Sequence, residues 1–569
     1  MRLTLPPLPQ SLSHEGPGKN LPPLPSRERA GERAARGWGS SRNPNLFACA
    51  CLLVLVTILI GSATAKTLRY ATQDEPQTLD PHSASLAVTT RLLSNVYEGL
   101  VGRDKNFKLV PWLATSWSQP DALTWRFRLR PNVKFHDGAT LTADDVVFSM
   151  ERILSPNSQF KSAVQGVAKA KKIDELTVDL IMREPNPVLL NHLFTFRIMN
   201  KAWAIRNNSV NPQNYKDKED TFSSRNTNGT GPFILKERQT DVKTVLIQNP
   251  NWWNAGSPEK GNVTEVVLLP IKSNATRAAA LLSGEVDFVN DPPPQDIARL
   301  KSGNEVKILE GLEARVQYLA FDTYREELLY SNIKGKNPFK DVRVRQAIAH
   351  AIDVQAIKTK VMRNLALPIG SIITATDQGY ARDADKRLPF DREKAKKLLA
   401  DAGYPTGFEV TLDCGNNQPA ADICQSIAPM LAQIGIKVNP NIVNTANYFV
   451  KLQKVDTSFY LLSWGTPTSD ALSTLQYLLR SNNGDNTGNG DGNYGRYSNP
   501  KFDQWVDAFR VEPDIKKRDT MIREALLILN TDLPVLPLHQ AIIPWAMRKN
   551  VTAIFPPNSV PYFFRFRID

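Results

Sequence analysis

The sequence predicts an α/β protein built from several structural units. At roughly 150 residues per domain, its 569 residues correspond to three or four units. Its composition, 41% hydrophobic and 22% charged, is that of a folded soluble protein and not of a collagen, a coiled coil or a disordered chain. Segments with helical spacing alternate with short strands in the second half, which favours an α/β fold over an all-β fold or a helical bundle.

The first 65 residues are predicted to lie outside the folded protein. Residues 1–41 contain LPPLP twice, among Arg and Glu, and form a low-complexity extension that cannot bury a core. One hypothesis is that the true translation start lies further downstream. Residues 42–65 have the layout of a signal peptide, because basic residues precede the apolar run Leu46–Ile60 and Ala-Thr-Ala follows it. The run is shorter than the roughly 20 residues that span a bilayer. We expect cleavage after Ala65, with an uncleaved membrane anchor as the alternative.

The charge of the remaining chain gives no sign of a nucleic-acid partner. The formal net charge is +13, but residues 1–65 contain seven Lys or Arg and three acids and so contribute +4 of it. The remaining +9 is spread over residues 66–569 without a run of Lys or Arg. A mildly basic solvated surface explains this balance.

Two cysteines remain after the predicted cleavage. Cys414 and Cys424 are ten residues apart, and in an exported protein this favours one disulfide that closes a small loop. Two unpaired thiols are the alternative. A redox site is not expected, because the chain has no Cys-x-x-Cys.

The first elements after residue 65 are strands and one well-marked helix. A strand is predicted over Lys66–Thr72, and Thr124–Arg130 alternates apolar and basic residues as a half-exposed strand does. A helix is predicted to start at the N-cap Thr142 and to run to about Leu154, with Asp144 complementing its N-terminal dipole.

Helices and strands then alternate along the second half. Four helices are predicted, over Val342–Met362, Asp391–Ala402, Ala421–Ile434 and Asp514–Leu529. Three strands are predicted between them, at Phe408–Leu412, Ile436–Pro440 and Phe459–Leu462.

Catalytic and metal-binding motifs are missing from the sequence. It contains no His-Glu-x-x-His, no zinc-ligand spacing of His and Cys, no P-loop and no Gly-x-Ser-x-Gly. Ser-x-x-Lys occurs at Ser257 and Ser331 without the Ser-Asp-Asn or Lys-Thr-Gly that would give it meaning. We therefore expect no enzyme activity, no cofactor and no metal.

Eight sequence blocks together point to one family. The blocks are YEGLV at 97–101, PWLATSW at 111–117, TWRFRLR at 124–130, VKFHDG at 133–138, GTGPF at 229–233, VRVRQAI at 342–348, AGYP at 402–405 and NYGRYSNP at 493–500. In order and spacing the chain resembles the extracellular solute-binding proteins of family 5, the peptide-, dipeptide- and nickel-binding components of ABC importers. The resemblance covers residues 66–569.

The resemblance implies a two-lobed periplasmic binding protein of class II type, with an extra inserted subdomain, that closes by a hinge on its solute. Lobe I would consist of residues 66–97, 205–310 and 531–569, the inserted subdomain of 98–204, and lobe II of 311–530. The protein would act as a monomer, bind a small solute and deliver it to the inner-membrane permease and its ATPases.

The resemblance also implies a cleft segment in SWGTPTSD at 463–470. Trp464 would form a flat apolar wall, unless it is a core residue, and Thr466 lies beside it. Peptide binders usually carry an Asp, paired with the peptide's ammonium, where this chain has Pro467. Asp470 could replace it, or could match a second acid of the family, so we expect a specificity that differs from simple free-amine dipeptides.

Further contacts are expected from the first part of the chain. Ser83 and Ser85 follow Leu-Asp-Pro-His, where the family has its first cleft segment, and Phe160 would add a second aromatic wall. Arg197 matches the place of a cleft arginine in nickel-binding relatives and could hold a carboxylate bidentately, unless it forms an internal salt bridge.

The expected cargo is a peptide or a peptide-like solute. The alternatives are a non-peptide cargo, such as a nickel chelate, an opine or a glycoside, and an exported chaperone-like binding protein on the same fold.

Overall fold

The computed structural model describes residues 66–569 except Ser85, Gln165, Lys216, Gln418, Pro467 and 485–487. The predicted extension, the signal segment and the cleavage site after Ala65 therefore lie outside the described residues, as does the predicted contact Ser85. Within the described part, no helix has both the length and the apolar character needed to cross a membrane.

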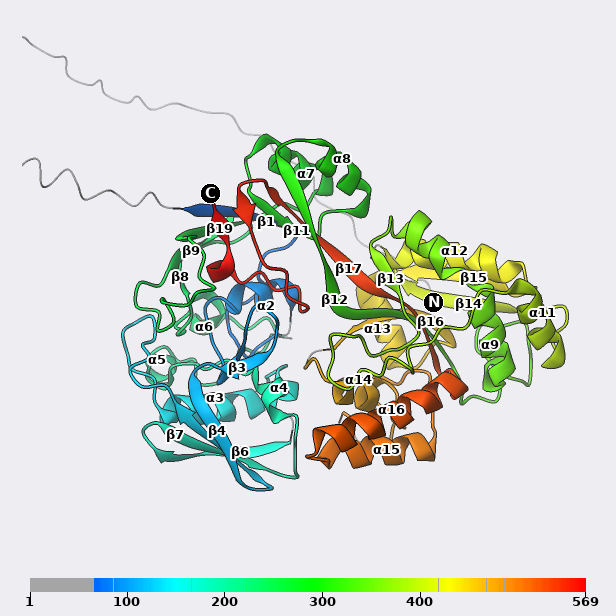
Figure 1. Cartoon of the computed structure of the whole chain (residues 1–569), viewed down its shortest axis with the longest axis horizontal. Coiled ribbons are helices and arrows are strands. Elements are labelled where there is room, and N and C mark those ends of the chain that lie inside the picture. The colour runs from blue at the N-terminus through cyan, green and yellow to red at the C-terminus, as the bar shows by residue number, and fades with distance from the viewer. Residues whose placement is uncertain are drawn as a thin grey trace, which may run out of the picture. The chain divides into compact units, whose positions relative to one another are not determined.

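The chain has the two-lobed α/β fold that the resemblance implied (Figure 1). In the described residues its main sheet has eleven strands. Their order is β15 (Lys437–Val443), β14 (Glu409–Gly415), β16 (Phe459–Gly465), β12 (Val306–Phe321), β17 (Val535–Arg548), β11 (Phe288–Asn290), β1 (Thr67–Thr72), β10 (Glu265–Pro270), β9 (Lys243–Gln248) and β8 (Phe233–Gln239), with β13 (Ala366–Pro368) paired to β17.

Two long antiparallel strands, β12 and β17, connect the lobes and run side by side in Figure 1. At one end β17 also pairs with β11, and at the other β12 also pairs with β16. The pairing of β12 with β17 shifts register between Leu312 and Val316, so the ladder is irregular where the chain passes between lobes. The predicted boundary at 310/311 falls just before this shift, and the one at 530/531 falls inside helix α16 (Ile515–Asp532).

A separate antiparallel sheet lies within residues 98–204. Its order is β4 (Ala114–Asp121), β5 (Thr124–Leu129), β7 (Thr177–Met182) and β6 (Val167–Asp174), and helix α3 (Ala143–Leu154) packs against it. The predicted alternation in β5 is real, because Trp125 and Phe127 are buried while Arg126 reaches across to Asp179 of β7 with two hydrogen bonds of 2.7 and 2.8 Å.

Short strands and helices complete the first lobe and the inserted region. The strands are β2 (Val101–Arg103), β3 (Leu109–Pro111), β18 (Val551–Thr552) and β19 (Arg567–Ile568). The helices are α2 (Ala87–Leu93), α4 (Leu189–Leu193), α5 (Lys201–Arg206), α6 (Phe222–Arg225), α7 (Asn274–Ser283) and α8 (Ile297–Ser302).

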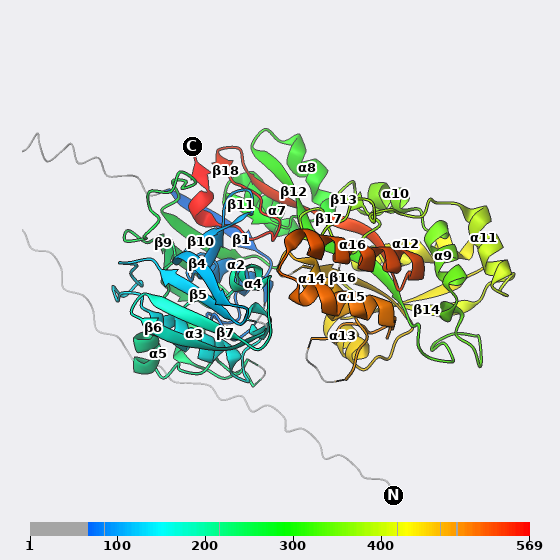
Figure 2. The ribbon, with the colours of Figure 1, turned by 60° about the horizontal axis from the view of Figure 1, so that its bottom comes forward.

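The second lobe packs helices on its part of the sheet (Figure 2). These are α9 (Val342–Ala351), α10 (Val354–Ala356), α11 (Arg392–Asp401), α12 (Ala420–Ala432), α13 (Thr445–Gln453), α14 (Ala471–Leu478), α15 (Pro500–Val511) and α16. Helices α15 and α16 lie side by side in both views and contact each other. The structure also joins Cys414 of β14 to Cys424 of α12 in a buried disulfide.

One predicted helix is interrupted. The sequence predicts that Val342–Met362 is largely helical, and the structure divides this segment: α9 ends at Ala351, and Ile352 takes an extended backbone conformation, with φ −91° and ψ 112°. Asp353 then caps a new helix by accepting a hydrogen bond from the amide of Ala356 at 2.9 Å. An aspartate in the middle of an apolar period competes with the helix in this way.

Candidate functional site

Trp464, the residue predicted to form an aromatic wall, stacks on a second ring. Trp464 lies at the end of β16, half-buried, and its indole stacks on Tyr477 of α14 with centroids 5.0 Å apart and planes 17° apart. Its Nε1 donates a hydrogen bond of 3.0 Å to the hydroxyl of Thr474. Because Tyr477 follows Trp464 by 13 positions across a loop and a helix, no local spacing in the sequence pointed to it.

Thr466, two residues after Trp464, contacts Asp377, an acid to which no pattern in the sequence pointed. Its hydroxyl donates 3.2 Å to Oδ2 of Asp377, which also accepts the hydroxyl of Thr374 at 2.8 Å and its amide at 3.0 Å. Asp377 is 5% exposed, and burial raises the pKa of its carboxyl to about 6. Its other oxygen, Oδ1, is buried without a hydrogen-bond partner among the described residues.

Asp470, by contrast, is buried and already paired with another side chain. It is fully buried, and Arg518 of α16 donates to its two oxygens at 2.6 and 2.8 Å. The same carboxylate caps α14 by accepting from the amide of Leu472 at 2.8 Å. A solute cation would have to break this pair to reach Asp470, so the geometry gives the residue a structural part and leaves its predicted contact with solute without support.

Arg197 and Phe160, both predicted contacts, lie together. The guanidinium of Arg197 stands 5.5 Å from the ring centroid of Phe160, and its Nη2 donates to the Ser94 hydroxyl at 3.1 Å and the Thr90 carbonyl at 3.4 Å. Its Nη1 is buried and has no partner, and no carboxylate pairs with Arg197 in the part of the chain that the structure describes. Burial lowers the pKa of this guanidinium to about 10, still far above neutral pH.

Arg197 borders a cavity that is lined by residues between 90 and 112, between 194 and 197, at 232 and between 558 and 565. We call it the arginine cavity, and its polar lining includes Thr90, Ser94, Tyr97, Glu98, Arg103, Arg197, Asn558, Tyr562 and Arg565. Arg565 is paired with Glu259 at 2.7 Å, whereas Arg197 has no such partner. A buried cation without a counter-ion favours a ligand that brings a negative charge.

Glu98, the carboxyl in the lining of the arginine cavity, is engaged elsewhere. It accepts the indole N–H groups of Trp112, Trp252 and Trp253 at 2.7 to 3.0 Å, and the hydroxyl of Thr230 at 2.7 Å. Burial raises the pKa of Glu98 to about 7. The cavity therefore keeps a positive balance from its arginines.

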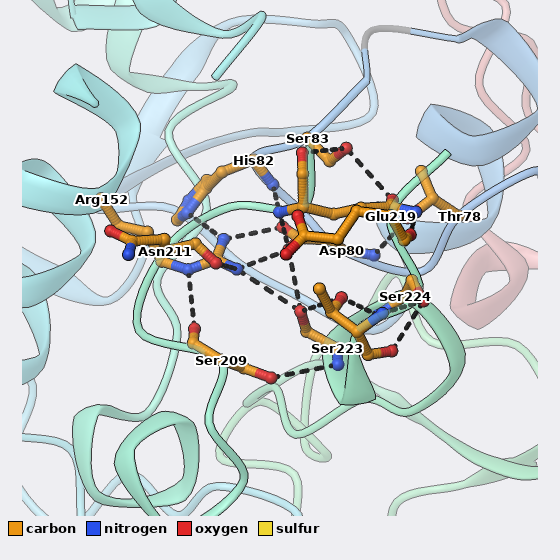
Figure 3. Close-up of polar contacts among 12 residues, drawn as sticks. Thr78, Asp80, His82, Ser83, Arg152, Ser209, Asn211, Glu219, Ser223 and Ser224 are labelled. Atoms are coloured by element: carbon orange, nitrogen blue, oxygen red, sulfur yellow. Dashed lines mark hydrogen bonds and ion pairs between the residues drawn. The ribbon is translucent and has the colours of Figure 1, made fainter. Parts of the chain in front are cut away.

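A buried polar network around Asp80, Arg152 and His82 (Figure 3) also reaches the backbone of Arg197. Arg152 of α3 donates to both oxygens of Asp80, at 2.7 and 2.5 Å, and to Nδ1 of His82 at 3.2 Å. The ring then donates from Nε2 to the carbonyl of Arg197 at 2.8 Å, because a carbonyl can only accept. Burial and the charge of Arg152 lower the pKa of His82 to about 3, so the ring is neutral.

Ser83 belongs to the same buried segment. Its hydroxyl donates to the backbone carbonyl of Gln213 at 3.0 Å, and its side chain is fully buried. The predicted contact between Ser83 and solute stays a prediction. Among the described residues, no group of three His, Cys, Asp or Glu side chains is placed to hold a metal ion.

A comparison with known families identifies the chain. The family described as bacterial extracellular solute-binding proteins, family 5 (middle region), matches residues 108–486, which is more than half of the sequence. The chain belongs to this family.

Relatives of family 5 extend over nearly the whole protein. The chain is 28% identical over 505 residues to the heme-binding protein A of Haemophilus influenzae, covering 84% of this chain and 88% of that protein. It is 27% identical over 501 residues to the glutathione-binding protein GsiB of Salmonella paratyphi A, covering 86% and 92%. Among solved structures, the binding protein AgaA of A. tumefaciens R10, in complex with agropinic acid, superposes with a TM-score of 0.71 at 27% identity, covering 88% and 99%.

Proposed function

We propose that this family 5 protein is the solute-binding subunit of an ABC importer and that it captures a peptide or peptide-like solute between its lobes. The observation that carries this cargo is Arg197, a buried guanidinium whose Nη1 has no hydrogen-bond partner and which forms no ion pair among the described residues. A carboxylate such as a peptide C-terminus would supply the missing charge and accept that N–H. Trp464 and Tyr477 supply an apolar wall of the kind that lines solute sites.

The role requires binding and release only, with no bond made or broken. The chain would be exported, cut after Ala65 and act in the periplasm as a monomer. Its lobe I would consist of residues 66–97, 205–310 and 531–569, its inserted subdomain of 98–204, and its lobe II of 311–530. It would then present its solute to the inner-membrane permease and its ATPases. This role is supported by the heme-binding and glutathione-binding relatives, which this chain matches over most of their length.

A non-peptide cargo is the second candidate, and one relative favours it. AgaA, at 27% identity, was solved with agropinic acid, so the fold at this distance accommodates solutes other than peptides. Such a solute could still place a carboxylate at Arg197.

Thermal unfolding of Lys66–Asp569, refolded to strip bound solute, tests the cargo. A ligand at about 100 times its dissociation constant stabilises the protein by roughly 2.7 kcal/mol, which shifts the melting temperature measurably. The panel contains dipeptides, longer and N-blocked peptides, glutathione, agropinic acid, nickel chelates and sugars. We expect a shift with peptides. A shift with non-peptides alone would move the cargo to the second candidate, and binding of unfolded client proteins without any small-solute shift would replace both by a chaperone role.

A further inference from the structure

Asp377 carries a buried oxygen for which the protein provides no partner. Three donors, from Thr374 and Thr466, converge on Oδ2, while Oδ1 has none among the described residues. An unsatisfied buried acceptor is costly, and native structures keep such groups where something else completes them. A donor from outside the protein would therefore complete the hydrogen bonding of Oδ1.

Among the described residues, Asp377 forms no ion pair with a Lys, Arg or His side chain. Arg518, which pairs with the nearby Asp470, donates to the two oxygens of that carboxylate and not to Asp377. Asp470 itself acts on Asp377 as a like charge, which adds to the effect of burial in raising the pKa of the Asp377 carboxyl. The ionised carboxylate of Asp377 therefore has no ion-pair partner within the part of the chain that the structure describes.

Asp377 lies in a segment that reaches the surface. Its neighbours Ala375, Thr376 and Gln378 are exposed, whereas Asp377 itself is buried. Thr466, which holds Oδ2, is half-buried and follows Trp464 by two residues on the loop after β16. A solute lying on the Trp464–Tyr477 wall would have this acid beside it.

The geometry also selects the kind of cation. A guanidinium pairs best with a carboxylate when both oxygens are free to receive its two parallel N–H groups. Here Oδ2 already accepts three hydrogen bonds, so only Oδ1 is available. A primary ammonium, a compact charge that can donate through a single N–H, fits one open oxygen.

We propose that Asp377 receives the primary ammonium of the solute through Oδ1. With Arg197 open to a carboxylate, the protein then has a separate receptor for each charge of a zwitterionic solute. This assignment rests on the proposed function and adds the charge class of the solute to it. It also gives lobe II a charged solute contact that Asp470, paired with Arg518, does not provide.

The test compares Asp377→Asn with Asp519→Asn. Asparagine keeps an oxygen for Thr374 and Thr466 and places an amide N–H₂ where the ammonium would bind. Asp519 is the matched control, because it is a partly exposed acid that accepts hydrogen bonds from the side chain of Gln378 at 3.0 and 3.3 Å, next to the same segment. The probes are glutathione and the tetrapeptide Ser-Thr-Ser-Ala, each with a free and with an N-acetylated amine, measured by calorimetry on stripped protein at pH 7.5.

We expect the wild type and the Asp519→Asn variant to bind a free-amine probe about 10- to 100-fold more tightly than its acetylated form. Asp377→Asn should lose that preference. The inference alone is overturned if Asp377→Asn keeps the preference, or if the wild type binds both forms of a probe equally, a result that requires no variant to fold. If the wild type binds none of the probes, the proposed peptide cargo fails, and the inference fails with it.

Discussion

The indole of Trp464 lies 5.0 Å from the ring of Tyr477, nearly parallel to it. The stack fixes the orientation of Trp464, and its hydrogen bond to Thr474 fixes the edge of the ring. A solute would therefore meet a preformed surface, which limits the entropy lost on binding.

Trp464→Ala should weaken the binding of any cargo that stabilises the wild type by about 10- to 100-fold, because it removes the face of the wall. Trp117→Ala, which removes a half-buried indole packed on Phe127 in the inserted sheet, should leave the affinity unchanged. Calorimetric titration measures both. Equal affinity of Trp464→Ala and wild type would show that the solute does not contact this loop.

Arg197→Met and Arg152→Met should have opposite effects. Arg197 has no acid partner among the described residues, so its replacement by methionine should leave the stability of the empty protein at or above that of the wild type. Binding of carboxylate-bearing solutes should weaken about 10- to 100-fold. Arg152 is fully buried against Asp80, so its loss strands a buried charge and should cost about 3–5 kcal/mol. Urea unfolding of the stripped variants distinguishes them, and a strongly destabilised Arg197→Met would contradict the assignment of an uncompensated charge.

Asp470→Asn should lower the free energy of unfolding. Its carboxylate and Arg518 form a buried pair at 2.6 Å, and removal of one charge from such a pair typically costs about 3–5 kcal/mol. Asp519→Asn, at a partly exposed acid, should change the unfolding free energy by less than about 0.5 kcal/mol. If Asp470→Asn unfolded like the wild type but lost the free-amine preference of the solute, Asp470 and not Asp377 would be the ammonium receptor.

His82 should make the protein sensitive to acid. Its folded pKa, lowered to about 3 by burial and by Arg152, lies below the roughly 6.5 of an unfolded histidine. Between these values the unfolded state binds the extra proton, so stability is full above about pH 6.5 and falls by about 1.4 kcal/mol per unit as the pH drops toward 3. Between pH 7 and 4.5, the wild type should lose roughly 2–3 kcal/mol more than His82→Gln in urea unfolding. Parallel losses would show that the ring is not held neutral.

The disulfide between Cys414 and Cys424 should stabilise lobe II. Closing a loop of ten residues' separation is worth about 2–3 kcal/mol in the chain-entropy account. The double variant Cys414→Ser, Cys424→Ser should show this loss, and a reducing agent should lower the stability of the wild type and not that of the variant. Alkylation of two thiols in the unreduced, unfolded protein would show that the bond is absent.

Local sequence patterns predicted much of the fold. The helix that starts after Thr142 and the alternation in Thr124–Leu129 follow from capping and from a period of two, which depend on near neighbours. The family-wide blocks led to the two-lobed architecture. The helix expected over Val342–Met362 was interrupted because the apolar period continued across Asp353, whose capping ability the period does not register.

The candidate site was less predictable, because its contacts depend on distant segments. Asp377 precedes Thr466 by 89 positions, and a Thr-x-x-Asp segment by itself indicates only a turn. The pairing of Asp470 with Arg518 spans 48 positions. Whether a charged side chain is open to solute or already paired is set by these tertiary contacts, and no periodicity encodes them.

The place of β17 in the sheet has a consequence for biosynthesis. This strand begins at Val535, yet it lies between β12 and β11 and so completes the sheet of both lobes. A nascent chain that stops before residue 535 lacks the strand to which β11, β12 and β13 all pair. The sheet therefore cannot be completed during most of translation, because its pairing partners wait for a strand made near the end of the chain.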